Sequence, residues 1–361
     1  RQWRSKYDIS LNENGTLVSY YQNLTFVFNE TLSGPGLKQS DKIMLYDAAI
    51  MGSILSVDMT YPITASSDAS LGRMDAIITK VFGETEQGPF TKHTVKDLLF
   101  DGVLLNCTDA SNIKTPGWKT FCVEVEAMVE KGSKTLRRKG EIIPGEPYDG
   151  DYLYSFFYAK TQLPSDGYYT IHTGTDDASL LGLIHEWENK TTLKYWKGPE
   201  CNQILGTDTT IFPPFLKRES RIDFFISDLC RSLYATFQRD AVYRDIPGYR
   251  YIPPQEQLGS VLEQPDNYCW AGPYSGGMTS GLIDLFHCYD APVVLSFPHF
   301  YQASPEYLDN IEGISAPVQE YTGFPMRGSK RAQFNMLMKE VRKVELTKGL
   351  RTVLMPLLWV D

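Results

Sequence analysis

The amino-acid sequence predicts a mainly β fold with inserted helices, and three observations carry this prediction. Short runs rich in aromatic and β-branched residues recur along the chain, and clusters of Pro, Gly, Asp and Asn separate them. Helical patterns are inserted among these runs rather than alternating with them, which favours a mixed barrel over βαβ units. An even number of cysteines and several N-x-Thr sequons favour a secreted or luminal chain.

The composition is that of an ordinary globular protein. The 361 residues are 42% hydrophobic and 22% charged, and this length allows two domains or one large β domain. The net charge of −9 argues against nucleic acid or an anionic membrane surface as the main partner. We find no signal peptide and no apolar run long enough to span a bilayer.

The first 33 residues predict a β-hairpin. Residues 6–11 alternate in polarity, Asn14-Gly15 is the strongest short hairpin signal, and residues 16–28 are rich in aromatic and β-branched side chains. A glycan on Asn14 would therefore lie at an exposed turn. The five sequons begin at Asn14, Asn23, Asn29, Asn106 and Asn189.

A Gly34-Pro35-Gly36 break precedes three predicted helices. Ser40 can cap the first, which extends through residue 54, and residues 70–82 and 94–100 predict the second and third. Their apolar spacing indicates only that they pack against something, either an ordinary core or a partner. Two glutamates, at positions 84 and 86, lie in the loop between the second and third helices, where solvation alone also accounts for them.

The spacing around the cysteines predicts one local disulfide and one cysteine on a buried helix face. Cys107 and Cys122 enclose a Pro/Gly-containing loop, and a disulfide that closes it would stabilise the fold by roughly 3 kcal/mol. A zinc site would need two further ligands, and no CxxC or HxxxH spacing appears, so the disulfide is favoured. A capping box at Ser220 and the apolar spacing after it predict a helix over 220–237 with Cys230 on its buried face.

A cysteine on such a face can link the helix to a distant strand, and Cys269 and Cys288 are candidate partners. The rest of the C-terminal two thirds reads as strand and turn. The predicted strands span residues 152–160, 168–172, 181–187, 191–196, 282–285, 293–297, 333–338 and 354–360.

No pattern in the sequence points to catalysis. The five histidines share no metal-ligand spacing, and nothing matches a nucleophile elbow, a P-loop or a dinucleotide fingerprint. The acidic pairs at 149–151 and 176–177 are too short for calcium loops and are explained by turn chemistry. His299, between Pro298 and Phe300, is interpreted as a core histidine. We predict that the chain is not an enzyme and uses no cofactor or metal.

Short motifs follow one another in a fixed order over most of the chain. They are Tyr195-Trp196, Gly206-Thr207-Asp208, Phe212-Pro213-Pro214-Phe215, Ser227-Asp228-Leu229-Cys230-Arg231-Ser232, Pro265-Asp266-Asn267-Tyr268-Cys269, Ser296-Phe297-Pro298-His299-Phe300, Ile311-Glu312-Gly313, Thr322-Gly323-Phe324-Pro325 and Pro356-Leu357-Leu358-Trp359. This set resembles the class B scavenger receptor family, which includes fatty acid translocase, the lysosomal integral membrane protein and the insect sensory neuron membrane proteins. The run from Leu98 to Gly102 that leads into Asn106-Cys107-Thr108 is most similar to the insect branch.

The resemblance implies one ectodomain fragment over residues 1–361. Its fold would be an asymmetric, antiparallel β-barrel that encloses a hydrophobic tunnel, with an apical helical bundle near residues 40–102 and a disulfide-stapled barrel near residues 150–361. It also implies the disulfides Cys201–Cys269 and Cys230–Cys288. Family members carry a membrane helix at each end, outside this chain, so we expect an extracellular or luminal ectodomain at a cell membrane.

The resemblance further implies a receptor or transporter of long-chain lipids. It would capture fatty acids or fatty-acid-derived pheromones and pass them through the tunnel to the membrane or to an odorant receptor. The alternative is a docking receptor that holds a protein or lipoprotein through its apex, as the lysosomal member holds a hydrolase. The apical candidates are Ile43, Leu45, Ile50, Ile54, Ile77, Val81, Glu84 and Glu86. The two glutamates stand where fatty acid translocase is basic, which counts against the binding of oxidised, anionic lipoproteins.

Overall fold

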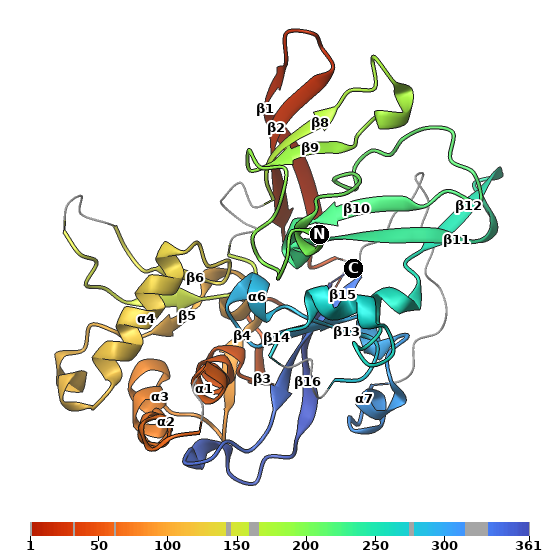
Figure 1. Ribbon diagram of the computed structural model, residues 1–361. Coiled ribbons are helices and arrows are strands. Elements are labelled where there is room, and N and C mark those ends of the chain that lie inside the picture. The colour runs from red at the N-terminus through yellow and green to blue at the C-terminus, as the bar shows by residue number, and fades with distance from the viewer. Residues whose placement is uncertain are drawn as a thin grey trace.

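The computed structural model describes residues 2–31, 33–60, 63–141, 146–158, 166–273, 278–314 and 331–360. Figure 1 shows helices α1, α2 and α3 gathered at one end of the molecule and the sheet with the N-terminal hairpin at the other. The expected motif Thr322-Gly323-Phe324-Pro325 lies outside the described ranges, as do the last two residues of the strand expected over 152–160.

The first sheet confirms the N-terminal hairpin. It is antiparallel, in the order β1-β2-β8-β9, and comprises β1 (Gln2–Leu11), β2 (Leu17–Phe26), β8 (Gly167–His172) and β9 (Ile184–Trp187). Gly15 adopts a φ of 66° in the turn between β1 and β2, where the Asn12 amide donates to the Leu17 carbonyl at 3.1 Å. Gly15 supplies the left-handed backbone that this turn requires.

The second sheet shows that the helix expected over 220–237 is wrong. These residues form β10 (Ile222–Ile226) and most of β11 (Arg231–Tyr243), which pairs with β12 (Ile246–Ile252). Buried and half-buried residues alternate strictly from 231 to 236, which is the period of a strand and not of a helix. Ser220 caps no helix, because its hydroxyl accepts from the Lys217 amide within a turn.

The third sheet confirms the strands expected near the C-terminus. It runs antiparallel in the order β13-β14-β15-β16, formed by β13 (Leu282–Asp284), β14 (Val293–Ser296), β15 (Ala332–Met338) and β16 (Val353–Val360). Pro356 lies at a register shift opposite Asn335, where a residue without an amide hydrogen is tolerated. Helices α6 (Phe286–Tyr289) and α7 (Pro305–Asp309) flank this sheet.

The helical region differs from the expectation at both ends. Residues Lys42–Tyr46 form strand β3, which pairs with β4 (Phe90–Thr94), and helix α1 begins only at Ala48 (Ala48–Thr60). Asp47 rather than Ser40 caps α1, because its Oδ1 accepts from the Ala49 and Ile50 amides at 3.0 and 3.1 Å. The second expected helix is two helices, α2 (Ala65–Leu71) and α3 (Met74–Phe82).

A further helix, α4 (Trp118–Glu130), was not expected. Its apolar residues recur at Trp118, Phe121, Cys122 and Val125, which is a helical spacing. From the sequence we predict only a disulfide-closed loop between Cys107 and Cys122. The third expected helix is a single π turn over Asp97–Asp101. The short 3₁₀ segments are Ala110–Lys114, Ala178–Leu180, Glu200–Asn202, Ser227–Leu229, Gln255–Leu258, Pro265–Trp270, Pro298–Phe300 and Glu345–Thr347.

The strand expected over 191–196 is also wrong. These residues make one isolated bridge, Thr192 with Gln203, and no ladder. The side chain of Asn202 replaces the ladder, since its Oδ1 accepts from the Trp196 amide at 3.0 Å and its Nδ2 donates to the Trp196 carbonyl at 2.7 Å. A buried backbone that is satisfied in this way has no need of a partner strand.

The described part of the chain combines sheets with a few helices, and its strands do not close into the expected barrel. They form five separate sheets, of which the smallest are β3-β4 and β5-β7-β6, with β5 (Val103–Leu105), β6 (Leu136–Arg138) and β7 (Tyr152–Tyr154). The main core lies where α1, α3 and α4 meet the third sheet, and it buries Ile50, Ile54, Ile78, Trp118 and Met336.

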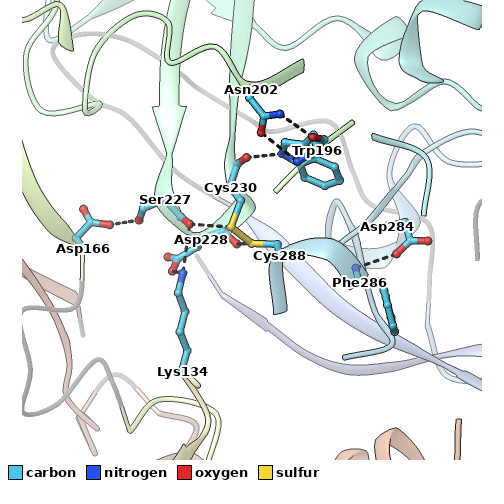
Figure 2. Close-up of a disulfide and its surroundings, with 10 residues drawn as sticks. All are labelled: Lys134, Asp166, Trp196, Asn202, Ser227, Asp228, Cys230, Asp284, Phe286 and Cys288. Atoms are coloured by element: carbon cyan, nitrogen blue, oxygen red, sulfur yellow. Dashed lines mark hydrogen bonds and ion pairs between the residues drawn. A yellow bond between two sulfur atoms is a disulfide. The ribbon is translucent and has the colours of Figure 1, made fainter. Parts of the chain in front are cut away.

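Three disulfides join distant parts of the chain: Cys107–Cys122, Cys201–Cys269 and Cys230–Cys288, with Cα–Cα distances of 5.9, 5.1 and 5.8 Å. These are the pairs implied above. Figure 2 shows the third of them, which ties the turn between β10 and β11 to α6. The Trp196 indole donates to the Cys230 carbonyl at 2.6 Å, and Lys134 lies 3.5 Å from an Asp228 carboxylate oxygen.

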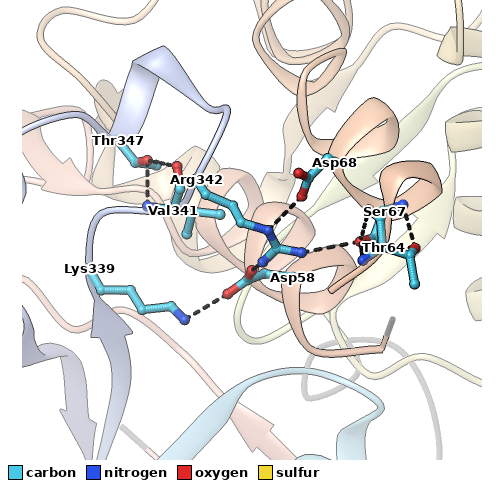
Figure 3. Close-up of polar contacts among 8 residues, drawn as sticks. All are labelled: Asp58, Thr64, Ser67, Asp68, Lys339, Val341, Arg342 and Thr347. Carbon is cyan, nitrogen blue, oxygen red and sulfur yellow. Dashed lines mark hydrogen bonds and ion pairs between the residues drawn. The ribbon is translucent and has the colours of Figure 1, made fainter. Parts of the chain in front are cut away.

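An ionic network ties the helical region to the turn after β15 (Figure 3). The carboxylate of Asp58 in α1 accepts from Lys339 Nζ at 2.7 Å and from Arg342 Nη1 at 2.6 Å. Arg342 also donates through Nε to Asp68 at 2.7 Å and through Nη2 to the Ser67 hydroxyl at 3.2 Å. The Asp58 side chain is only 10% exposed, and it compensates the charge of Lys339, whereas Arg342 is shared between Asp58 and Asp68.

We expect Asp58→Asn to lower the free energy of unfolding by about 1–3 kcal/mol, because two charge-assisted hydrogen bonds lose their anionic acceptor. Urea denaturation of the disulfide-intact chain measures this change. Asp240→Asn is the matched control, since Asp240 pairs with Arg218 at 3.0 Å but is 62% exposed and should change stability little. Equal losses in both variants would contradict the assignment.

Candidate ligand-binding cleft

A cleft of about 310 Å³ opens beside the end of β2. Four short segments of the chain form it: the end of β2 with the two residues that follow, the stretch before β3, the π turn after β4 with the residue before it, and strand β6. The lining residues are Phe26, Val27, Phe28, Gln39, Lys96, Phe100, Asp101 and Arg137. The volume lies at the lower end of the range of roughly 300–1,000 Å³ that is typical of small-molecule sites.

One wall of the cleft is aromatic. The ring of Phe26 stacks on that of Phe157 with centroids 4.6 Å apart, and the Phe100 ring lies 6.2 Å from Phe157. The Phe157 amide donates to the Leu99 carbonyl at 2.9 Å, which fixes this ring against the π turn. Such a wall offers a large, rigid apolar surface at little cost in side-chain entropy.

Two cations and one carboxylate surround the aromatic wall. Lys96 Nζ lies 2.8 Å from Asp101 Oδ2, and this hydrogen bond raises the pKa of Lys96. Arg137 donates to the backbone carbonyl of Asp101, and its guanidinium carbon lies 4.2 Å from the centroid of the Tyr158 ring. The lining therefore carries one net positive charge beside an apolar surface. That combination can hold an apolar chain with an anionic head group.

The apical candidates fall into two groups. Ile50, Ile54, Ile77 and Val81 are at most 5% exposed and pack in the main core, so they present no surface to a partner. The remaining four are not in helices: Ile43 is 40% exposed and Leu45 half-buried in β3, while Glu84 and Glu86 are exposed in the loop after α3. The structure thus separates these candidates rather than bringing them together in one site.

None of the cleft residues was predicted from the sequence. The run from Leu98 to Gly102 marks only the family branch in the sequence, although Phe100 and Asp101 within it line the cleft. No spacing in the sequence relates Phe26, Lys96 and Arg137, because different sheets bring them together. The one local signal was the aromatic content of residues 16–28.

The five sequons differ in accessibility. Asn14 and Asn189 are exposed in turns, whereas Asn23 lies within β2 with a buried Oδ1. Asn29 and Asn106 are half-buried. Glycosylation stays a prediction for all five, and the exposed turns at Asn14 and Asn189 are its best candidates.

Neither a metal cluster nor a membrane span is found in the part of the chain that the structure describes. In it, no three His, Cys, Asp or Glu side chains gather as a metal site. The described helices include none with the combined length and hydropathy that a bilayer crossing requires.

Three disulfides are typical of a chain that folds in an oxidising, extracellular or luminal compartment. A family comparison makes the class specific. The chain belongs to the CD36 family, the class B scavenger receptors, whose model matches residues 1–361. Members are membrane proteins with an extracellular ectodomain, and they act as receptors or transporters.

Curated relatives are insect sensory neuron membrane proteins. The chain is 30% identical over 385 residues to sensory neuron membrane protein 2 of Drosophila melanogaster, covering 98% of this chain and 66% of the relative. It is 29% identical to sensory neuron membrane protein 1 of Manduca sexta, covering 100% of this chain and 66% of that protein. Sensory neuron membrane protein 2 of Anopheles gambiae is 33% identical over 81% of this chain and 52% of its own length. The chain thus spans about two thirds or less of these relatives.

Proposed function

We propose that this chain is the ectodomain part of a cell-surface lipid receptor or transporter that captures a long-chain amphiphile without covalent chemistry. The ligand class is a fatty acid or a fatty-acid-derived pheromone. The observation that carries the proposal is the cleft, which places an aromatic wall beside Lys96 and Arg137. The sensory neuron relatives support a pheromone-related role.

The physical basis is the poor solubility of such ligands. Each methylene gains about 0.8 kcal/mol on leaving water, so even partial insertion of an acyl chain against Phe26 and Phe100 gives useful affinity. A carboxylate head group can then accept a hydrogen bond from Lys96 or Arg137. In the structure Lys96 pairs with the Asp101 carboxylate, and Arg137 donates to the Asp101 backbone carbonyl. Asp101 opposes a second anion, and the two cations outweigh it.

Transport extends this proposal beyond capture. A ligand bound in the cleft would pass through an enclosed hydrophobic tunnel to the membrane or to an odorant co-receptor. The tunnel would lie inside the β-barrel that the family resemblance implies. Residues 1–361 would act as one ectodomain held at the membrane by helices outside this chain. Family membership supports these steps.

We expect Arg137→Gln to weaken the binding of a fatty acid of about sixteen carbons roughly tenfold, because a charge-assisted hydrogen bond is lost. The matching long-chain alcohol should bind this variant as it binds the unmodified chain. Phe100→Ala should weaken acid and alcohol alike, also about tenfold, through lost apolar contact. Displacement of a fluorescent fatty acid from the purified, disulfide-intact chain gives these affinities.

Arg221→Gln is the matched control, since Arg221 also lies over an aromatic ring, that of Tyr234 at 3.9 Å, but stands outside the cleft. It should leave both affinities unchanged. If Phe100→Ala binds both ligands with unchanged affinity, the cleft is not the site. If Arg137→Gln weakens acid and alcohol equally, Arg137 does not select the head group.

A second candidate function is docking of a protein or lipoprotein at the apex. Exposed apolar side chains on β3 favour it, since Ile43 is 40% exposed and the adjacent Met44 is 59% exposed. In that case Met44→Glu would abolish capture of the protein partner and leave the lipid affinity intact. Native mass spectrometry of the glycoprotein purified from cells separates the two functions, because only the first predicts a co-purifying lipid.

A further inference from the structure

A second, smaller cavity of about 40 Å³ lies between β11, β13 and the turn over Pro265–Trp270. Arg231 lines it and is only 3% exposed. The Nε of Arg231 and the indole Nε1 of Trp270, which also lines the cavity, are both buried without a hydrogen-bond partner among the described residues. The Arg231 guanidinium carbon lies 3.4 Å from the Trp270 ring centroid, so these two donors belong to one site.

The disulfides build this pair of donors into the fold. Arg231 follows Cys230, whose φ of 50° turns the chain sharply into β11, and Trp270 follows Cys269. The Cys230–Cys288 and Cys201–Cys269 bonds therefore fix the backbone next to each donor. The alternation of β11 then points the Arg231 side chain to the buried face. Arg231 is therefore buried because its position in β11 places its side chain on the buried face of the strand.

Such a guanidinium needs an anion. Burial lowers the pKa of Arg231 to about 9, so the group still carries its charge at neutral pH. None of the described carboxylates lies within ion-pair distance of it, although Asp284 also lines the cavity, where its Oδ1 accepts from the Phe286 amide at 2.9 Å. An uncompensated buried charge costs several kcal/mol. Water can accept from the free N–H groups, but it cannot neutralise the charge.

We propose that this cavity is a binding site for a small monovalent anion, of the size of a halide or a single carboxylate group, held by Arg231 and the Trp270 indole. The cavity of about 40 Å³ has room for a small anion in place of water. The site is distinct from the aromatic cleft, because the two share no lining residue. It would couple the stability of the disulfide-linked region to the anion content of the surrounding fluid.

Anion-dependent unfolding of the disulfide-intact chain tests the site. Urea unfolding is followed at constant sodium concentration while gluconate, a bulky reference anion, is replaced by chloride, bromide or acetate. At an anion concentration 100 times its dissociation constant, the unfolding equilibrium constant should fall about 100-fold. A response to chloride and bromide alone identifies a halide site, and a response to acetate identifies a carboxylate site.

Variants separate this site from general salt effects. Arg231→Gln should abolish the dependence, and Trp270→Phe, which keeps the ring but removes the indole donor, should reduce it. Asp284→Asn should strengthen it by removing an opposing charge. The matched control is Arg250→Gln, since Arg250 is 8% exposed with an unpartnered Nε but does not line this cavity. It should keep the full anion dependence.

Two results would overturn the proposal. The first is that the unmodified chain has the same stability in gluconate as in every smaller anion. The second is that Trp270→Phe and Arg231→Gln both keep the full dependence of stability on the anion. A bromide soak of crystals adds a direct measurement that needs no variant to fold. Where bromide stabilises the chain in solution, its anomalous signal should lie within hydrogen-bond distance of Arg231, and a cavity without signal would then count against the site.

Discussion

Replacing Cys230 and Cys288 together by serine is expected to lower the free energy of unfolding by roughly 4 kcal/mol. The bond closes a loop of 58 residues, and the chain-entropy model assigns a larger loss to longer loops. It also anchors the turn between β10 and β11, where the Trp196 indole donates to the Cys230 carbonyl. Chemical denaturation of the secreted double variant measures the loss, and secretion yield records it if the variant does not accumulate.

The double variant Cys107→Ser with Cys122→Ser is the control. That bond closes a loop of only 15 residues, for which the same model gives roughly 3 kcal/mol. The longer loop should therefore show the greater loss. The reverse order would mean that loop length does not set the contribution of these bonds.

Gly206→Ala is expected to destabilise the fold by more than about 3 kcal/mol. Gly206 has a φ of +81°, and an added Cβ would lie 1.9 Å from the carbonyl oxygen of Asp223. The clash falls where β9 meets β10, because the Gly206 carbonyl accepts from Ile184 at 2.8 Å and the Thr207 amide donates to Asp223 at 3.2 Å. Backbone must move on both sides to admit one methyl group.

Gly349→Ala isolates the conformational part of this effect. Gly349 also has a positive φ, +76°, but an added Cβ meets nothing within 4 Å. It should cost only about 1–2 kcal/mol, the ordinary penalty for a left-handed residue with a side chain. Thermal or urea unfolding of the two variants compares them directly. Similar losses would show that the close approach of the Asp223 backbone contributes little to the effect.

Sequence alone recovered the strands where alternation coincides with strong turn residues. The Asn14-Gly15 hairpin and the strands near residues 293–297 and 333–338 are examples. It failed over 220–237, because Ile222, Phe225 and Leu233 follow a helical spacing, and only pairing with neighbouring strands shows that these residues belong to β10 and β11. A cap can mislead in the same way, since Ser220 bonds within a turn.

The candidate sites were beyond prediction for a different reason. Phe26, Lys96 and Arg137 are far apart in the chain, and tertiary packing alone brings them together. The run from Leu98 to Gly102 indicated the insect branch of the family, but it gave no functional role to Phe100 and Asp101. Arg231 lies within a recognised motif and Trp270 directly follows one, each next to a cysteine, yet only the register of β11 reveals that the arginine is buried. Motif order identified the family, whereas the chemistry of the sites required coordinates.

The arrangement of four cysteines has a consequence for biogenesis. The intervals 201–269 and 230–288 overlap, and Cys201, Cys230 and Cys269 lie in one buried cluster with Cys288 packed against it. A nascent chain in the secretory pathway could join these neighbours in three ways, and thiol exchange among them needs little movement. We therefore expect the native pairing of these four cysteines to depend on the docking of β10, β11 and the turn that carries Cys269.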